Sequence, residues 1–260
     1  MRAAEEAAFA GGVSAETLMD QAAAGIARTV RKFFPSPGCC LVFAGKGNNA
    51  GDAFAAAEIL HSLGWGIELR LSFADEELGE LARKKLRRSS APNESSRRPL
   101  VILDGLLGLG AKPPLREPIR AAAREINRLR REENAFVFAI DFPTGLDGET
   151  GAADDDCVRA DVTVTIGFAK RGLIVDDALD FVGRIEVIAL DDLRAPAGDF
   201  NAIVAGAGAL SHLLPRRKFG AYKNQFGRVG ILAGSKGLTG AAVMCSLGAL
   251  RGGGGLVELF

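Results

Sequence analysis

A glycine-rich segment at residues 43–54 constrains the fold most strongly. It reads Phe-Ala-Gly-Lys-Gly-Asn-Asn-Ala-Gly-Asp-Ala-Phe, after an apolar run and before an alanine-rich run. This order predicts a strand, a tight turn and a helix whose first N–H groups face a phosphate. The glycine spacing matches neither the dinucleotide fingerprint G-x-G-x-x-G nor a nucleoside-triphosphate loop. A turn without a ligand explains the glycines, but one helix cap does not require three polar side chains, Asn48, Asn49 and Asp52.

Short apolar runs bounded by polar turns recur along the chain and alternate with amphipathic stretches. Such runs are typical of strands buried on both faces of a parallel sheet between two helical layers. Ser14 is placed to cap a first helix that runs to about Phe33, before Pro35. Strands are expected at 39–44, 67–72, 100–104, 135–140, 161–166 and 184–188. Further helices are expected at 52–63, 75–88 and 115–131, and a solvated loop at 87–98.

The composition argues against several classes of protein. The 32 basic and 32 acidic groups balance, so no nucleic-acid or anionic-membrane partner is expected. The 4 cysteines show neither disulfide spacing nor a metal pair, which favours the reducing cytoplasm. No apolar run reaches the roughly 18–20 residues of a membrane span, and the acidic N-terminus is unlike a secretion signal. His61 falls in a predicted helix and His212 in a linker-like segment, so histidine-based catalysis is not expected.

Three polar clusters directly follow predicted strands, at residues 48–52, 104–110 and 141–147. In an open parallel sheet, ligands bind beyond the carboxyl ends of the strands. Each aspartate alone is explained as a cap or turn former. The convergence of all three clusters indicates a hard cation held by oxygen ligands, an acid–base group, or both. Asn, Asp and Thr offer oxygen ligands, so no soft metal is implied.

A change of composition near Asp191 indicates the end of the first unit. After a segment punctuated by glycine and proline, residues 228–233 predict a strand, 234–242 a glycine turn into a helix, and 256–260 a second strand. One such unit cannot bury its own sheet. We therefore expect the start of a second domain, with open apolar strand edges that favour association and a possible homo-oligomer.

The three clusters resemble, in order, the motifs of the NAD(P)H-hydrate epimerase family. They read Gly-Lys-Gly-Asn-Asn-Ala-Gly-Asp at 45–52, Asp-Gly-Leu-Leu-Gly-Leu-Gly at 104–110 and Asp-Phe-Pro-Thr-Gly-Leu-Asp at 141–147. The resemblance covers about residues 1–192 and includes the stretch 160–170, which ends at Lys170. Residues 226–252 resemble the opening of the ADP/ATP-dependent NAD(P)H-hydrate dehydratase domain. The implied organisation is an epimerase domain at 1–195, a linker at 196–226 and an incomplete dehydratase domain at 227–260.

This resemblance implies a Rossmann-like three-layer α/β/α sandwich with a mostly parallel sheet, followed by an incomplete ribokinase-like α/β segment. The implied substrate is hydrated NADH or NADPH, and the implied cofactor is a potassium ion held by Asn49, Asp104 and Thr144. The substrate-binding residues carried over from the family are Asn48, Asn49, Ala50, Gly51, Asp52, Gly108, Leu109, Gly110, Ala111, Lys112, Pro113, Pro114 and Asp141. The family usually has Gly at the positions of Ala50 and Ala53, and Ser at the position of Thr144.

The implied reaction is interconversion of the R and S hydrates at C6 of the nicotinamide ring, a step of nicotinamide nucleotide repair. We hypothesise that Asp141 is the acid–base group. Dehydratase activity is not expected, because the family's later glycine-rich segment and its aspartate have no counterpart in these 260 residues. A non-catalytic dinucleotide-binding or scaffold protein on the same fold is the alternative. A hydride-transferring dehydrogenase is disfavoured, because G-x-G-x-x-G is absent.

Overall fold

The computed structural model describes residues 1–87, 98–194, 205, 210–213 and 216–260. The chain forms two units, Met1–Asp199 and Phe200–Phe260, and each is described by itself. Most of the expected loop at 87–98 lies outside the described residues, and so do residues 196–204, 206–209 and 214–215 of the expected linker. None of the helices in the described part combines the length and the apolar run that a membrane span needs.

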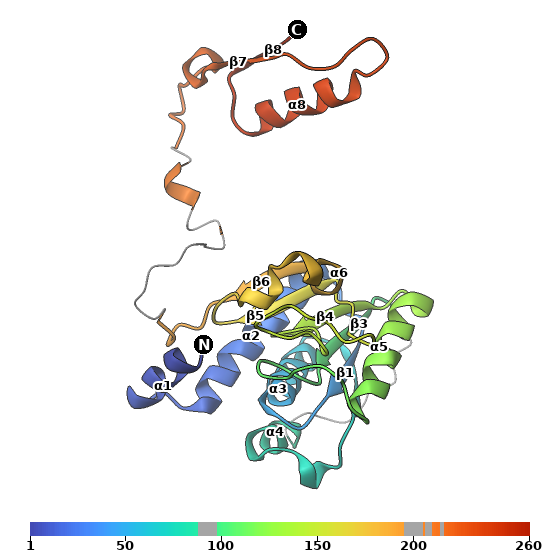
Figure 1. Ribbon diagram of the computed structural model, residues 1–260. Coiled ribbons are helices and arrows are strands. Elements are labelled where there is room, and N and C mark those ends of the chain that lie inside the picture. The colour runs from blue at the N-terminus through green and yellow to red at the C-terminus, as the bar shows by residue number, and fades with distance from the viewer. Residues whose placement is uncertain (88–97, 195–204, 206–209, 214–215) are drawn as a thin grey trace. The chain divides into compact units, whose positions relative to one another are not determined.

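The first unit is built on a six-stranded sheet in the order β2-β1-β3-β4-β5-β6, with every neighbouring pair parallel. The expected fold class is therefore confirmed, and each strand lies within one residue of its predicted bounds (Figure 1). The strands are β1 (Cys39–Ala44), β2 (Gly66–Leu71), β3 (Leu100–Gly105), β4 (Phe136–Ile140), β5 (Val162–Ile166) and β6 (Arg184–Ile188).

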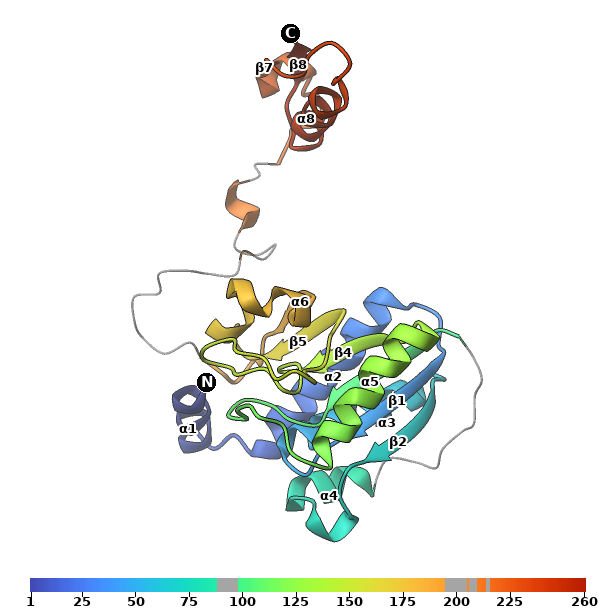
Figure 2. The same ribbon diagram turned by 45° about the vertical axis from the view of Figure 1, so that its right-hand side comes forward.

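Helices cover both faces of this sheet. The side chains of β1 alternate, so that Val42 packs with α2 (Ala15–Phe33) and α3 (Asn48–Ser62), and Phe43 packs with α5 (Ile119–Glu133). This alternation follows from the period of two in a strand. Figure 2 shows α5 across the sheet from α2 and α3. The remaining helices are α1 (Arg2–Ala10), α4 (Glu80–Leu86) and α6 (Leu179–Val182).

Three helix starts differ from the prediction. Helix α3 begins at Asn48, four residues before the expected start, because Gly47 and not a later residue caps it. Helix α5 begins at Ile119 instead of 115, because Pro118 occupies its cap position. A proline disfavours helical backbone at the residue before it, so the helix does not extend toward residue 115. Only a 3₁₀ turn, Asp75–Glu77, precedes α4 where a longer helix was expected. No helix was expected at the position of α1.

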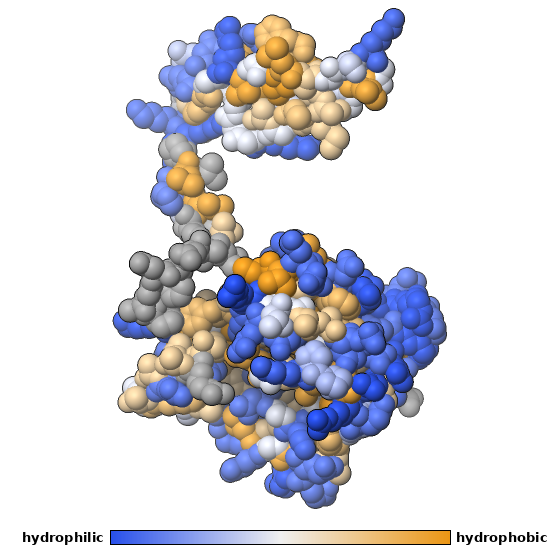
Figure 3. All heavy atoms as spheres, viewed as in Figure 1, coloured by the Kyte–Doolittle hydropathy of each residue, from blue (hydrophilic) through white to orange (hydrophobic). Residues whose placement is uncertain are grey.

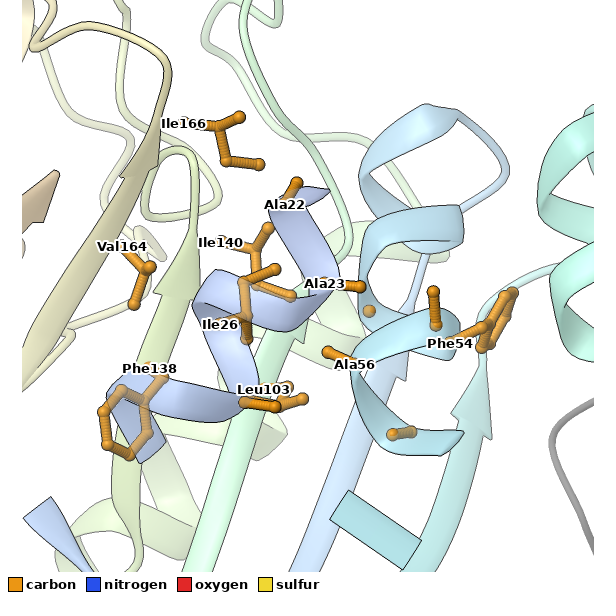
Figure 4. Packing of buried hydrophobic residues seen from close by; sticks show 14 of the residues in the cluster. Ala22, Ala23, Ile26, Phe54, Ala56, Leu103, Phe138, Ile140, Val164 and Ile166 are labelled. Carbon is orange, nitrogen blue, oxygen red and sulfur yellow. The ribbon is translucent and has the colours of Figure 1, made fainter. Parts of the chain in front are cut away.

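Small residues let α2 and α3 approach the sheet closely. Ala23 and Ile26 of α2 pack beside Ala56 of α3, over Leu103 and Phe138 of the sheet (Figure 4). A Cβ at Gly25 of α2 would lie 2.4 Å from the Ile188 side chain, and one at Gly51 of α3 would lie 2.5 Å from Met19. This tight layer holds the N-terminus of α3 rigidly at the edge of the sheet.

The second unit consists of β7 (Arg228–Ile231), α8 (Gly240–Arg251) and β8 (Leu256–Leu259), with β7 and β8 parallel. This matches the predicted strand, glycine turn, helix and strand. Many of its large apolar side chains are exposed, and Figure 3 shows hydrophobic residues across the visible face of this unit. The exposed ones include Val229, Leu232, Leu238, Val243, Met244, Leu247, Leu250, Leu259 and Phe260.

Candidate active site

A cavity of about 870 Å³ opens at the carboxyl edge of the large sheet, where the chain leaves β1, β3 and β4. Residues from all three predicted clusters line it. They are Asn48, Asn49, Asp52, Gly108, Leu109, Gly110, Ala111, Lys112 and Asp141. Three segments far apart in the sequence therefore meet at one site, as expected for an open parallel sheet.

Four predicted substrate-binding residues do not line the cavity. Ala50 and Gly51 are buried inside α3, and Pro113 and Pro114 lie beside the cavity wall. Ala50 does not have a positive φ. The Cβ that distinguishes Ala50 from the usual glycine of the family is therefore accommodated by an ordinary helical backbone.

The turn from β1 into α3 forms one wall of the cavity. A Cβ at Gly45 would lie 2.0 Å from the Leu106 carbonyl oxygen, so only glycine lets this turn pass against the loop after β3. Gly47 caps α3, and Gly47, Asn48 and Asn49 all line the cavity. The positive end of the α3 dipole and its free N–H groups therefore face this space, which favours an anion there.

Asn49, Asp104 and Thr144 are connected by hydrogen bonds through the backbone of Leu107. The Asn49 side-chain amide donates to the Leu107 carbonyl at 2.9 Å, and the Leu107 N–H donates to the Thr144 hydroxyl at 3.2 Å. The same hydroxyl donates to Asp104 Oδ1 at 2.7 Å, and the Thr144 N–H donates to Asp104 Oδ2 at 2.8 Å. Asp104 and Thr144 are thus buried behind the cavity wall, and these hydrogen bonds join them to Asn49, which lines the cavity.

The chemistry of these groups suits a hard monovalent cation. They supply one carboxylate, one amide oxygen and one hydroxyl, all oxygens. Within the described residues, His, Cys, Asp and Glu side chains form no group of three or more that could hold a metal. Burial raises the pKa of Asp104 to about 6, against the hydrogen bonds from Thr144 and Leu106, which lower it. A bound cation would favour the ionised form of this carboxyl.

Asp141 ends β4 with a positive φ of 65°, an uncommon conformation for a residue with a side chain. Its carboxylate forms an ion pair with Lys170 and accepts from the Ile166 N–H at 3.2 Å. The Lys170 ammonium also donates to the Thr165 hydroxyl at 2.9 Å and to the Ile166 carbonyl at 2.7 Å. The strand end of β5 therefore fixes Lys170, and Lys170 holds Asp141 at the cavity.

Asp52 lies one turn into α3 and reaches the same cavity. Its pKa is raised well above the usual value, mainly by burial among protein groups and next by the negative charges of Asp141 and Glu5. Lys170 and Lys85 oppose this shift but do not cancel it. Asp52 and Asp141 therefore differ in electrostatic environment, although both line the cavity.

Sequence reasoning missed other residues of the cavity wall. Lys46 and Gly47 lie within the first motif and Asp147 within the third, so the motifs carried a signal for them. Glu5 and Phe73 lie on segments that carried none. The complete set of residues missed is Met1, Glu5, Lys46, Gly47, Phe73, Leu106, Leu107, Ile119, Asp147, Gly148, Glu149 and Ile166.

Residues 15–172 match the family model described as YjeF-related protein N-terminus. The chain belongs to this family. The resemblance to NAD(P)H-hydrate epimerases that the three motifs carry is confirmed by this match, which spans all of them. The matched range contains the three motifs whose residues line the cavity.

Curated relatives extend well beyond this chain. The bifunctional NAD(P)H-hydrate repair enzyme Nnr of Pyrobaculum aerophilum is 34% identical over 257 residues, which cover 93% of this chain and 50% of that protein. The enzyme of the same name from Escherichia coli is 32% identical over 99% of this chain and 51% of its own length. The chain therefore spans about half the length of the curated relatives it matches.

A solved structure supports the fold. The crystal structure of the yeast protein ynu0 (YNL200c) superposes with a TM-score of 0.54 at 24% identity, over 61% of this chain and 73% of the yeast chain. At this level of identity the similarity concerns the fold alone.

Proposed function

We propose that this chain interconverts the R and S forms of hydrated NADH and NADPH at C6 of the nicotinamide ring, as an isomerase of nicotinamide nucleotide repair. The observation that carries the proposal is the meeting of the three family motifs around one cavity that contains a positioned carboxylate, Asp141. Membership of the family and the names of the curated relatives agree with this activity.

The cavity offers a distinct place for the phosphates of a dinucleotide. The N-terminus of α3 and the glycine turn at Gly108 and Gly110 provide backbone N–H groups and close approach. Lys46 and Lys112 add positive charge on the same wall, and Lys46 stacks 4.8 Å from the centroid of the Phe73 ring. In this arrangement the pyrophosphate lies near these groups, and the nicotinamide ring lies near Asp141.

The chemistry required is proton transfer to and from the oxygen on a hemiaminal carbon. C6 of the hydrate carries a hydroxyl group next to the ring nitrogen, whose lone pair expels the oxygen once that oxygen is protonated, or opens the ring. Inversion needs one bond at C6 to break and to form again on the other face. A carboxyl group held against the ring takes part in this proton transfer, and such catalysis contributes roughly 10²–10⁴-fold. We assign this acid–base role to Asp141.

Asn49, Asp104 and Thr144 would hold the potassium ion, since hydrogen bonds through Leu107 join these three side chains. When bound, potassium would supply fixed positive charge beside the phosphates. The protein's own contribution is to tie the loop after β3 to the loop after β4 through Leu107 and Thr144. This hydrogen bond fixes the position of the loop that contains Gly108 relative to the loop that contains Asp141.

An interconversion assay on separated R and S hydrates tests the proposal. Wild-type protein is expected to accelerate equilibration, and Asp141→Asn to lose roughly 10²–10⁴-fold in rate with the fold intact. Asp155→Asn is the matched control, because this exposed aspartate lies outside the cavity. Wild-type rates in the Asp141→Asn variant would remove Asp141 from its role. Binding of hydrates without any acceleration by wild type would favour the non-catalytic alternative.

A further inference from the structure

Two of the aspartates that line the cavity, Asp141 and Asp52, have surroundings that are opposite in kind. Asp141 has a cation as its direct partner, since its carboxylate pairs with the Lys170 ammonium. Lys170 is itself only 8% exposed and has two further acceptors, the Thr165 hydroxyl and the Ile166 carbonyl. These three acceptors hold the Lys170 ammonium in place, and the ammonium in turn holds the Asp141 carboxylate in place.

Asp52 has no such partner. Within the described residues its carboxyl group makes no hydrogen bond and no ion pair, although it reaches the cavity surface. Burial among protein groups disfavours its charged form, and so do the neighbouring carboxylates of Asp141 and Glu5. These surroundings favour the protonated form of Asp52, and its side chain is within reach of a ligand in the cavity.

Two carboxyl groups with environments that separate their protonation states are the usual arrangement of an acid and a base at one site. We propose that Asp52 is a catalytic residue, the proton donor to the leaving C6 hydroxyl, and that Lys170 is a positioning residue that holds Asp141 as the carboxylate beside the ring. This inference rests on the proposed epimerase function. In this inference the proton is carried by Asp52 on α3, and the negative charge by Asp141 directly after β4.

The reaction then balances without any further reagent. Asp52 gives its proton to the C6 hydroxyl, the C6–O bond breaks with its electron pair on the departing water, and the lone pair of the ring nitrogen forms a double bond to C6. The Asp141 carboxylate stabilises this cation. Water adds to C6 from the other face, the electron pair returns to nitrogen, and the Asp141 carboxylate accepts the proton that this water releases. Exchange with solvent then returns a proton to Asp52 and removes the one on Asp141. Nothing is oxidised or reduced, and substrate and product have the same atoms.

The first test is the pH dependence of kcat/KM. Because the protonated form of Asp52 is required, the wild-type rate is expected to fall at alkaline pH. Asp52→Asn should lose roughly 10²–10⁴-fold, and Glu58→Gln, an exposed position on the same helix, should match wild type. Asp52→Asn with wild-type rate and wild-type pH profile would overturn the proposal.

The second test separates positioning by Lys170 from a merely structural role. The charged groups that act on Asp52 are Asp141, Glu5, Lys170 and Lys85. Lys170→Met removes a cation, so the alkaline fall should move to higher pH and the rate should drop on the order of 10²-fold. Lys170→Arg keeps the positive charge, so its rate and the pH of its alkaline fall should both lie closer to wild type. A Lys170→Met variant that loses rate without moving the pH profile would contradict the positioning role.

A third measurement needs no turnover and keeps this inference distinct from the proposed function. In protein with ¹³C-labelled aspartate carboxyls, the signal absent from Asp52→Asn is expected to titrate well above the ordinary range near 4. Asp141→Asn should shift this titration to lower pH, because it removes a neighbouring negative charge. An Asp52 signal that titrates near 4 would overturn the inference even in an active epimerase. Wild-type protein that fails to interconvert the hydrates would instead sink the proposed function.

Incorporation of ¹⁸O from water distinguishes the proposed C6–O cleavage from ring opening. If water leaves and adds again, each inversion should place solvent oxygen on C6, and label should enter at the rate of epimerisation. Epimerisation that proceeds while the hydroxyl keeps its original oxygen would indicate cleavage of the ring bond and would overturn Asp52 as donor to that hydroxyl.

Discussion

At the residue scale, the site depends on how each buried carboxyl group is compensated. Asp104 is fully buried but accepts hydrogen bonds from the Thr144 N–H, the Thr144 hydroxyl and the Leu106 N–H. These bonds limit the rise of its pKa to about 6. Asp52 has no hydrogen bond of this kind within the described residues, so only the charges of Lys170 and Lys85 oppose the rise of its pKa by burial and like charge. In the proposed function, Asp104 would hold the cation and Asp52 the proton.

The raised pKa of Asp52 predicts a pH-dependent effect on stability. The folded protein binds the Asp52 proton more tightly than the unfolded chain, so this group lowers the free energy of unfolding as pH rises from about 4 through its folded pKa. Asp52→Asn removes that loss. The variant should therefore melt at a higher temperature than wild type at pH 8, and the difference should vanish near pH 4. Equal melting temperatures across this range would show that Asp52 ionises in the folded state as easily as in water.

The Thr144 hydroxyl predicts a link between potassium and stability. Thr144→Val removes the hydrogen bonds to Asp104 and from Leu107 and leaves a buried carboxyl less satisfied, which costs roughly 1–3 kcal/mol. The rise in melting temperature on replacing a large organic cation with potassium should be lost in Thr144→Val. Thr144→Ser keeps the oxygen and should keep the rise. A full potassium effect in Thr144→Val would remove this residue from the cation site.

At the scale of elements, the sequence predicts the bounds of the strands well and the first residues of the helices poorly. Strands β3 and β4 are buried on both faces, so their apolar runs have few other interpretations. The start of α3 was placed too late, because Asn48 and Asn49 resemble turn residues and only the backbone at Gly47 shows that the helix has begun. Helix α1 was not predicted, because its apolar face is short. Only its packing against the rest of the core shows which of its residues are buried.

Close packing of α3 on β3 gives a prediction at this scale. A Cβ added at Gly105 would lie 2.6 Å from the Ala53 Cβ and 3.2 Å from the Asn49 carbonyl oxygen. Gly105→Ala should therefore push α3 outward and lower stability by roughly 1–3 kcal/mol. The double variant with Ala53→Gly removes the closer contact and should recover part of the loss. Chemical denaturation of the four proteins in this cycle measures the coupling, and purely additive losses would contradict a direct contact between these positions.

At the scale of the whole molecule, the sequence predicted that three clusters would meet but not what completes the cavity around them. Parallel strands bring residues 48–52, 104–110 and 141–147 to one edge by topology alone. Glu5 and Phe73 reach the same space from segments without a motif. Their positions follow from how α1 and the chain after β2 pack, and that packing is decided by the complete core and not by local sequence.

The two compact units lead to the last prediction, because their cores differ. The first unit buries its sheet between helices, whereas α8 leaves Val243, Leu247 and Leu250 between 45% and 49% exposed at helical spacing. Exposed apolar faces of this kind favour association. A chain that ends at Asp199 should therefore keep the interconversion rate of the full chain and associate less at equal concentration. In the full chain Leu247→Glu should reduce association similarly, with Arg251→Glu on the same helix as the control for added negative charge. Sedimentation velocity measures the association, and unchanged association in both the shortened chain and Leu247→Glu would show that the first unit carries the contact.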